Sequence, residues 1–115
     1  MRFKETRNFS PTFMFNALEA READAISAYS TDGRLAADTY MLLDDPRGAL
    51  PSYDAMLMLS PRLSQNEKAI AALQPLIGAI DVAMMQEANF SVDREDEAKV
   101  TPETAARNLA EKIGL

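Results

Sequence analysis

The first part of the chain changes from a helical to an extended pattern of hydrophobic positions. Ser10-Pro11 is a favourable helix start, because serine accepts hydrogen bonds from free backbone amides and proline loses no bond at the first helical position. We expect this helix to run to about Glu22. Its buried face should carry Phe13, Met14, Ala17 and Leu18. A short strand that ends at Tyr29 follows.

Two further strands are predicted in the middle of the chain, after a single helical turn over residues 34–38. Residues 39–43 form a compact apolar run that stops at the turn signal Asp-Asp-Pro-Arg-Gly of residues 44–48. Residues 53–59 are apolar without alternation, as strands covered on both faces are. Tyr40 lies inside the first apolar run, so we expect it to pack in the interior rather than contact a ligand.

The second half is predicted to be mainly helical. Residues 64–67, Ser-Gln-Asn-Glu, match a capping box, in which side chains three apart satisfy each other's backbone donors. Pro75 should kink or break the helix that follows, because its ring clashes with the carbonyl four residues back. Asp81 is expected to cap a short helix over residues 82–88.

The chain is expected to close with a brief extended piece over residues 89–92 and a charged loop over residues 94–99. A final helix should begin at Thr101-Pro102 and end at Gly114. Strands and helices mixed in this way indicate an α/β protein.

Composition and charge exclude several function classes. The chain has 115 residues, 47% hydrophobic and 26% charged, which suits one soluble globular domain. A net charge of −6 would repel a nucleic acid, so none is expected as a partner. No apolar run reaches the roughly 20 residues of a membrane span, and no export signal is visible at the N-terminus.

The absence of cysteine and histidine bears on catalysis. Without them, disulfides, thiol chemistry and a Ser-His-Asp triad are impossible, and the usual general base and commonest metal ligand are missing. The acidic clusters lie in turns or charged loops with no phosphate-binding glycine loop nearby. We therefore expect no enzyme activity, no catalytic residue, no metal site and no cofactor.

The most informative local pattern is Tyr-Ser-Thr-Asp-Gly-Arg at residues 29–34, where an apolar run gives way to hydrogen-bonding groups. Gly33 allows a turn, and in open α/β sheets ligands bind at the ends of strands. A binding site is one interpretation. An ordinary strand and turn is another, with the polar side chains bonding their own backbone or Asp32 pairing with Arg34. Pattern alone leaves the function open.

Four segments, taken in order along the chain, resemble the motifs of one protein family. Residues 29–34 resemble its Y-S-T-D-G-R signature, and Leu50-Pro51-Ser52-Tyr53 resembles its F-P-P-Y segment. Residues 76–93 resemble L-x-G-K-I-D-x-x-x-M-x-x-L-N-Y-x-V-D, and residues 102–106 resemble the start of the family's last helix. The family comprises the substrate-binding proteins of osmoprotectant ABC importers, which bind glycine betaine, choline and related quaternary amines.

The resemblance implies a partial periplasmic-binding-protein-like fold of type II, with a mixed sheet, flanking helices and a helical C-terminal half. Family members hold the ligand between two lobes, and this chain resembles only their C-terminal portion. On that mapping residues 1–37 are a remnant of the second lobe and residues 38–45 are a strand that crosses the hinge. Residues 46–115 would be the C-terminal part of the first lobe.

The resemblance also implies the ligand-binding residues. A quaternary ammonium ion has no N–H to donate, so proteins hold it against the faces of aromatic rings, each contact contributing about 0.5 to 2 kcal/mol. Tyr29 and Tyr53 stand where the family supplies the aromatic rings of its cage. Ser30, Thr31 and Asp32 are candidates for contacts with the ligand's carboxylate or hydroxyl end.

The implied partners are a quaternary ammonium small molecule and the permease of an ABC importer, in a periplasmic or other extracytoplasmic location. Because the family's remaining cage aromatics have no counterpart in this chain, we expect it to bind weakly or not at all by itself. Uncovered apolar surface would favour a homo-oligomer, for which exchange of segments is an easy route. The alternative function is a stand-alone interaction or regulatory module that retains the lobe fold without binding a ligand.

Overall fold

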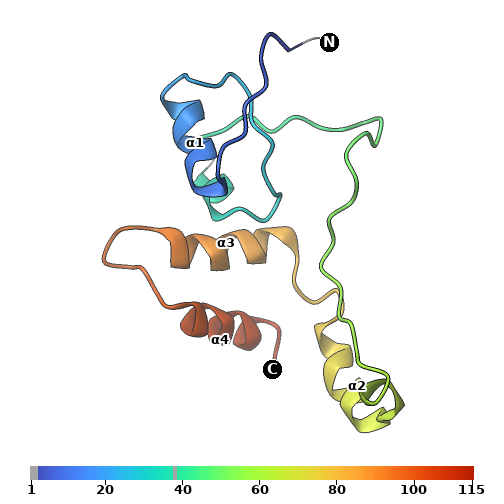
Figure 1. The fold of residues 1–115 in the computed structure, drawn as a ribbon. Coiled ribbons are helices and arrows are strands. Elements are labelled where there is room, and N and C mark those ends of the chain that lie inside the picture. The colour runs from blue at the N-terminus through green and yellow to red at the C-terminus, as the bar shows by residue number, and fades with distance from the viewer. Residues whose placement is uncertain (1–2, 38) are drawn as a thin grey trace.

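The structure is a computed structural model that describes residues 3–37 and 39–115 (Figure 1). Over these ranges the chain forms α-helices and short 3₁₀ helices joined by long irregular segments, and no β-strand. In chain order the elements are α1 (Pro11–Glu19), η1 (Gly33–Ala37), η2 (Leu63–Gln65), α2 (Glu67–Leu73), η3 (Gln74–Leu76), α3 (Val82–Asp93) and α4 (Pro102–Lys112).

The prediction of an α/β fold with a mixed sheet is therefore wrong. The strand expected to end at Tyr29 and those expected over residues 39–43 and 53–59 are irregular chain. An apolar segment becomes a strand only where a second strand supplies the ladder of hydrogen bonds, and no described backbone pairs with these segments. The strand expected to cross a hinge over residues 38–45 is absent from residues 39–45, and Asp38 lies outside the described residues.

Two helix boundaries differ from the predictions in the second half. Ser64 does not cap the helix, because its hydroxyl donates to the carbonyl of Pro61 within a separate turn at 3.0 Å. Asn66 is the cap of α2, and its Oδ1 accepts from the amide of Ala69 at 3.1 Å. The prediction of an extended piece over residues 89–92 is also wrong, because α3 continues through these residues without a glycine or proline to interrupt it.

The other helix signals of the second half are confirmed, whereas in the first half the side chain of Ser10 makes no capping bond and α1 ends at Glu19 rather than at about Glu22. The α-helix α2 stops at Leu73, just before Pro75, where the chain tightens into η3. Asp81 caps α3 by accepting from the amide of Met84 at 2.8 Å. Thr101 caps α4, and Gly114, with a φ of 81°, lies just beyond its end. The charged loop over residues 94–99 is irregular, as expected.

The packed centre of the molecule is formed by α3 against η1, and α1 joins it through Arg34 of η1, which contacts Phe15 and the carbonyl of Pro11 (Figure 1). Phe15, which is only 1% exposed, is its largest buried side chain, whereas Phe13, expected to face inward, is 61% exposed. The Phe15 ring meets the edge of Tyr40, with ring centroids 5.2 Å apart, and the Arg34 guanidinium lies 3.8 Å from its centroid on a ring face. Tyr40 therefore packs on the central ring as expected, although it is half-buried rather than fully interior.

The molecule is extended rather than compact. Its radius of gyration is 17.8 Å, whereas a compact chain of this length has about 13 Å. Its accessible surface is 10224 Å², against about 6,200 Å² for a compact protein of this mass. Residues 39–62, here called the arm, contribute to this extended shape, because they lead away from the packed centre to α2 (Figure 1).

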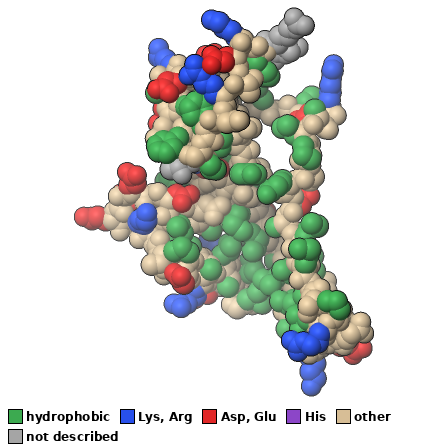
Figure 2. Space-filling model, viewed as in Figure 1, with side chains coloured by type: hydrophobic (Ala, Val, Ile, Leu, Met, Phe, Trp, Pro, Cys, Tyr) green, Lys and Arg blue, Asp and Glu red, His purple; other side chains and the backbone are tan. Residues whose placement is uncertain are grey.

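Hydrophobic side chains are exposed along the arm, as the green atoms in Figure 2 show. Met58 is 89% exposed. The arm's other exposed large hydrophobic side chains are Met41, Leu42, Leu43, Leu50, Tyr53, Met56 and Leu57. Among residues 3–37 and 39–115, none of the helices combines the length and the hydrophobicity that a membrane crossing requires.

Candidate ligand-binding site

The polar turn after Tyr29 is closed by its own backbone. The amide of Asp32 donates to the carbonyl of Tyr29 at 3.0 Å, and the amide of Leu35 donates to the carbonyl of Asp32 at 3.1 Å. Because these bonds turn the chain directly into η1, Tyr29 lies at a corner, where its side chain is 53% exposed.

Gly33 lets this turn lie directly against α3. A Cβ at this position would lie 2.4 Å from the backbone nitrogen of Phe90, closer than real Cβ contacts come. Any side chain here would push the turn and the helix apart. The glycine of the Tyr-Ser-Thr-Asp-Gly-Arg pattern is therefore needed for close approach to α3.

Two side chains of α3 hold the turn in place. The Nε2 of Gln86 donates to the carbonyl of Ser30 at 2.7 Å, and the Nδ2 of Asn89 donates to the carbonyl of Thr31 at 2.7 Å. Sequence reasoning missed both roles. The segment resemblance included Asn89, but the residue was assigned to an extended piece rather than to a helix facing the turn.

Asp32 and Arg34 form the ion pair that one of the sequence interpretations anticipated. Asp32 Oδ1 accepts from the Arg34 Nε and backbone amide, both at 3.1 Å, and its Oδ2 accepts from an Arg34 terminal nitrogen at 3.0 Å. Arg34 also donates to the carbonyl of Pro11 at 3.3 Å, which ties the turn to α1.

The pair determines the charge state of Asp32. Burial alone would raise the pKa of this carboxyl, but the hydrogen bonds from Arg34 and its positive charge outweigh burial and lower the pKa from its usual value. Asp32 therefore carries its negative charge throughout the neutral range, balanced by the guanidinium of Arg34.

Tyr29 and Tyr53 come together, although they belong to different segments. Their ring centroids are 5.0 Å apart and their planes are tilted by 38°. Tyr53, on the arm, is 82% exposed, so both rings are open to solvent. With their centroids 5.0 Å apart the rings contact each other, so no trimethylammonium group fits between them. A cation is attracted within about 6 Å of a ring centroid, so one position can still lie within reach of both rings. A bound cation would therefore lie beside the pair, against both rings.

An open hollow of about 400 Å³ lies beside the two rings. Its lining residues are Tyr29, Thr31, Asp32, Gly33, Tyr53, Asn89 and Asp93. Of the five residues expected to bind a ligand, Tyr29, Thr31, Asp32 and Tyr53 line this hollow, whereas Ser30 does not and is held through its carbonyl. Asn89 and Asp93 join the lining from α3. Within the described residues no group of three or more acidic side chains could hold a metal ion.

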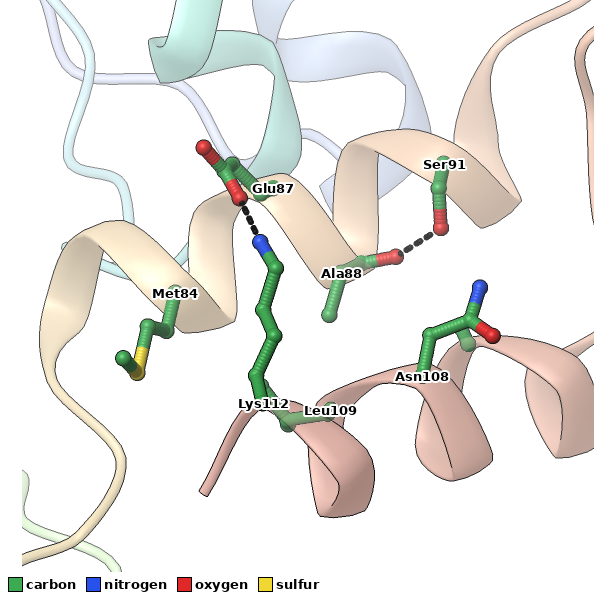
Figure 3. A pocket seen from close by; sticks show the side chains of 8 residues that line it. Met84, Glu87, Ala88, Ser91, Asn108, Leu109 and Lys112 are labelled. Atoms are coloured by element: carbon green, nitrogen blue, oxygen red, sulfur yellow. Dashed lines mark hydrogen bonds and ion pairs between the residues drawn. The ribbon is translucent and has the colours of Figure 1, made fainter. Parts of the chain in front are cut away.

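A second hollow lies between α3 and α4 (Figure 3). Its floor is apolar, with Met84, Ala88 and Leu109 among the lining residues, and Lys112 pairs with Glu87 across its edge at 2.5 Å. This hollow is the seam between two packed helices. It lacks aromatic rings, so the first hollow is the better candidate for a binding site.

Comparisons with known proteins give a consistent result. The model of a family described as the substrate-binding domain of ABC-type glycine betaine transport systems matches residues 3–112. A carnitine transport binding protein of Listeria monocytogenes is 28% identical over 92 residues, which are 79% of this chain and 30% of that protein. A glycine-betaine-binding protein of Pseudomonas aeruginosa is 30% identical over 106 residues, 91% of this chain and 33% of that protein. No solved structure gives a significant match.

Proposed function

Since this chain belongs to the family of substrate-binding domains of ABC-type glycine betaine transport systems, we propose that it binds a quaternary ammonium solute for an importer of that type. The chain spans about a third of the length of the curated relatives that it matches. It would supply one part of a binding site and would not catalyse a reaction. Its partners would be the solute and the importer's permease, at the extracytoplasmic side of the membrane.

The observation that carries this proposal is the pairing of Tyr29 and Tyr53, with centroids 5.0 Å apart. Two adjacent rings offer a methylated cation two electron-rich surfaces, and tyrosine combines such a surface with a hydroxyl group that stays solvated. The hollow beside the rings is large enough for a small amine and open enough to admit it.

The polar residues would have different roles around the bound solute. Thr31 lines the hollow, and its hydroxyl group could form a hydrogen bond with the polar end of the ligand. Asp32, with both oxygens engaged by Arg34, would contribute mainly by holding the turn. Ser30 would hold the turn through the bond that its carbonyl accepts from Gln86.

The affinity of the chain alone should be low. Two ring contacts contribute about 1 to 4 kcal/mol together, and a dissociation constant of 1 mM already requires about 4 kcal/mol. Part of that gain is offset by the cost of immobilising the ligand. We therefore expect dissociation constants above about 1 mM for the isolated chain.

Titration of the ¹⁵N-labelled chain with choline, followed by NMR, tests the proposal at such weak affinity. Choline should shift amide signals around the hollow, and Tyr29→Ala or Tyr53→Ala should each reduce the shifts several-fold by removing one ring contact. Tyr40→Phe is the matched control, because Tyr40 contacts Phe15 away from the hollow. Shifts that survive both alanine substitutions would rule out binding on these rings.

A second candidate function is suggested by the exposed apolar arm. Its unpaired backbone and exposed side chains such as Met58 could pair with the arm of a second copy, giving a homo-oligomer or an interaction module. The surface exceeds that of a compact protein by about 4,000 Å², which is several times the roughly 800 Å² that each partner contributes to a stable interface.

A further inference from the structure

The charges around the hollow favour a ligand of different charge from carnitine and glycine betaine, the zwitterions in the names of the relatives. We propose that the site prefers a quaternary ammonium ion with net positive charge, such as choline, over a zwitterion with a carboxylate, such as glycine betaine. Asp93 would be the residue that sets this preference. The inference rests on the proposed function, since it concerns the same hollow.

The charged residues that line the hollow are both acids, Asp32 and Asp93. They are not equivalent, because Arg34 bonds both oxygens of Asp32. Asp93 is exposed and forms no ion pair within the described part of the chain. The next residue, Arg94, pairs with Asp96 at 2.6 Å and lies over the ring of Phe90. The uncompensated charge of the lining is therefore negative.

The position of Asp93 in the fold adds to this effect. It is the last residue of α3, a helix of 12 residues. The carbonyl groups at a helix C-terminus carry partial negative charge and favour cations close by. The C-terminus of α3 and the carboxylate of Asp93 therefore both favour a positively charged ligand.

A ligand carboxylate would find no cation in the lining to bind it. The available donors are neutral: the tyrosine hydroxyls, the Thr31 hydroxyl and the amide of Asn89, which already donates to the carbonyl of Thr31. A carboxylate near Asp93 would also be repelled. A hydroxyl end, as in choline, can donate or accept and carries no charge to be repelled.

The preference can be measured by NMR titration of the full 115-residue chain with choline and, separately, with glycine betaine. We expect choline to bind about two- to fivefold more tightly, the size of effect that one exposed charge a few ångströms away produces. Asp93→Asn should abolish most of this difference by weakening choline binding. Glu97→Gln is the matched control, because it removes the same charge from an exposed loop residue outside the hollow.

The outcomes separate this inference from the proposed function. Equal or tighter binding of glycine betaine, or an Asp93→Asn variant that behaves like Glu97→Gln, would overturn the charge preference while Tyr29-dependent binding still supported the proposed function. If neither ligand shifts the signals around the hollow at about 100 mM, far above the expected onset of binding, both proposals fail. A choline preference that shrinks with added salt would support the role of Asp93 further.

Discussion

Gly33 shows how a single residue determines the geometry of the candidate site. The glycine is buried against the backbone of α3, and its lack of a Cβ allows the turn that carries Tyr29 to approach Phe90. Its position in the Tyr-Ser-Thr-Asp-Gly-Arg pattern indicated a turn. The sequence could not show that the space beside it is filled by a helix more than 50 residues further along, because nothing local specifies that contact.

Gly33→Ala should destabilise the protein and weaken ligand binding. The added methyl group would lie 2.4 Å from a backbone nitrogen, and overpacking of this kind costs about 1–3 kcal/mol. Unfolding in urea measures the effect. Gly48→Ala is a useful comparison, because a Cβ there meets nothing within 4 Å and only the positive φ should cost about 1 kcal/mol. Equal effects of the two substitutions would contradict the role of close packing at Gly33.

The Asp32–Arg34 pair predicts a dependence of stability on pH. Because the pKa of Asp32 is lowered in the folded protein, its contribution is complete above the unfolded value of 3.8 and is lost as pH falls through the lower folded value. Between about pH 6 and pH 3, the free energy of unfolding should fall less steeply in Asp32→Asn than in the original protein. Identical slopes would show that Asp32 gains nothing from its pair on folding.

At the scale of elements, the helices could be predicted from local sequence signals, whereas the predicted strands did not form. Asp81, Pro75 and Thr101-Pro102 act on backbone groups within four residues, so their effects could be predicted from the sequence. The apolar segments of the arm require partners from elsewhere, and the described residues offer none. The same limit applies to α3, whose side chains Gln86 and Asn89 bond the turn just before η1.

Asn89→Ala tests whether α3 holds the turn of the candidate site. Loss of the bond at 2.7 Å leaves the Thr31 carbonyl without its donor, which should cost about 1–2 kcal/mol and weaken choline binding. Asn16→Ala is the matched control, because Asn16 is an exposed asparagine within α1. The account would be contradicted if the two variants had the same stability and the same affinity.

At the scale of the whole molecule, the sequence allowed us to predict the family and that the chain matches only part of its members. It did not allow us to predict the architecture. The collinear motifs indicated the family to which the chain belongs. The expected sheet, in contrast, rested on apolar runs of this chain and on a resemblance to a family whose curated members are about three times as long. With buried hydrophobic side chains limited, in the described residues, to Phe15, Ala17 and Ala105, the molecule leaves most of its apolar surface uncovered.

This exposure predicts self-association through the arm. Sedimentation should show a concentration-dependent dimer or larger species, and Met58→Lys should shift it toward the monomer, because a charge at an exposed apolar contact opposes burial. Gln65→Lys adds the same charge to an exposed residue of η2, beyond the arm, and should leave the distribution unchanged. A monomer at all concentrations would contradict the role given to the arm.

The central claim is that Tyr29 and Tyr53 together receive a methylated cation, and transferred nuclear Overhauser effects between choline and the protein test it most directly. The N-methyl protons of choline should give cross-peaks to the ring protons of both tyrosines and none to Tyr40, whose ring packs on Phe15. Cross-peaks confined to Tyr40 or to the seam between α3 and α4, with none to Tyr29 or Tyr53, would contradict the account.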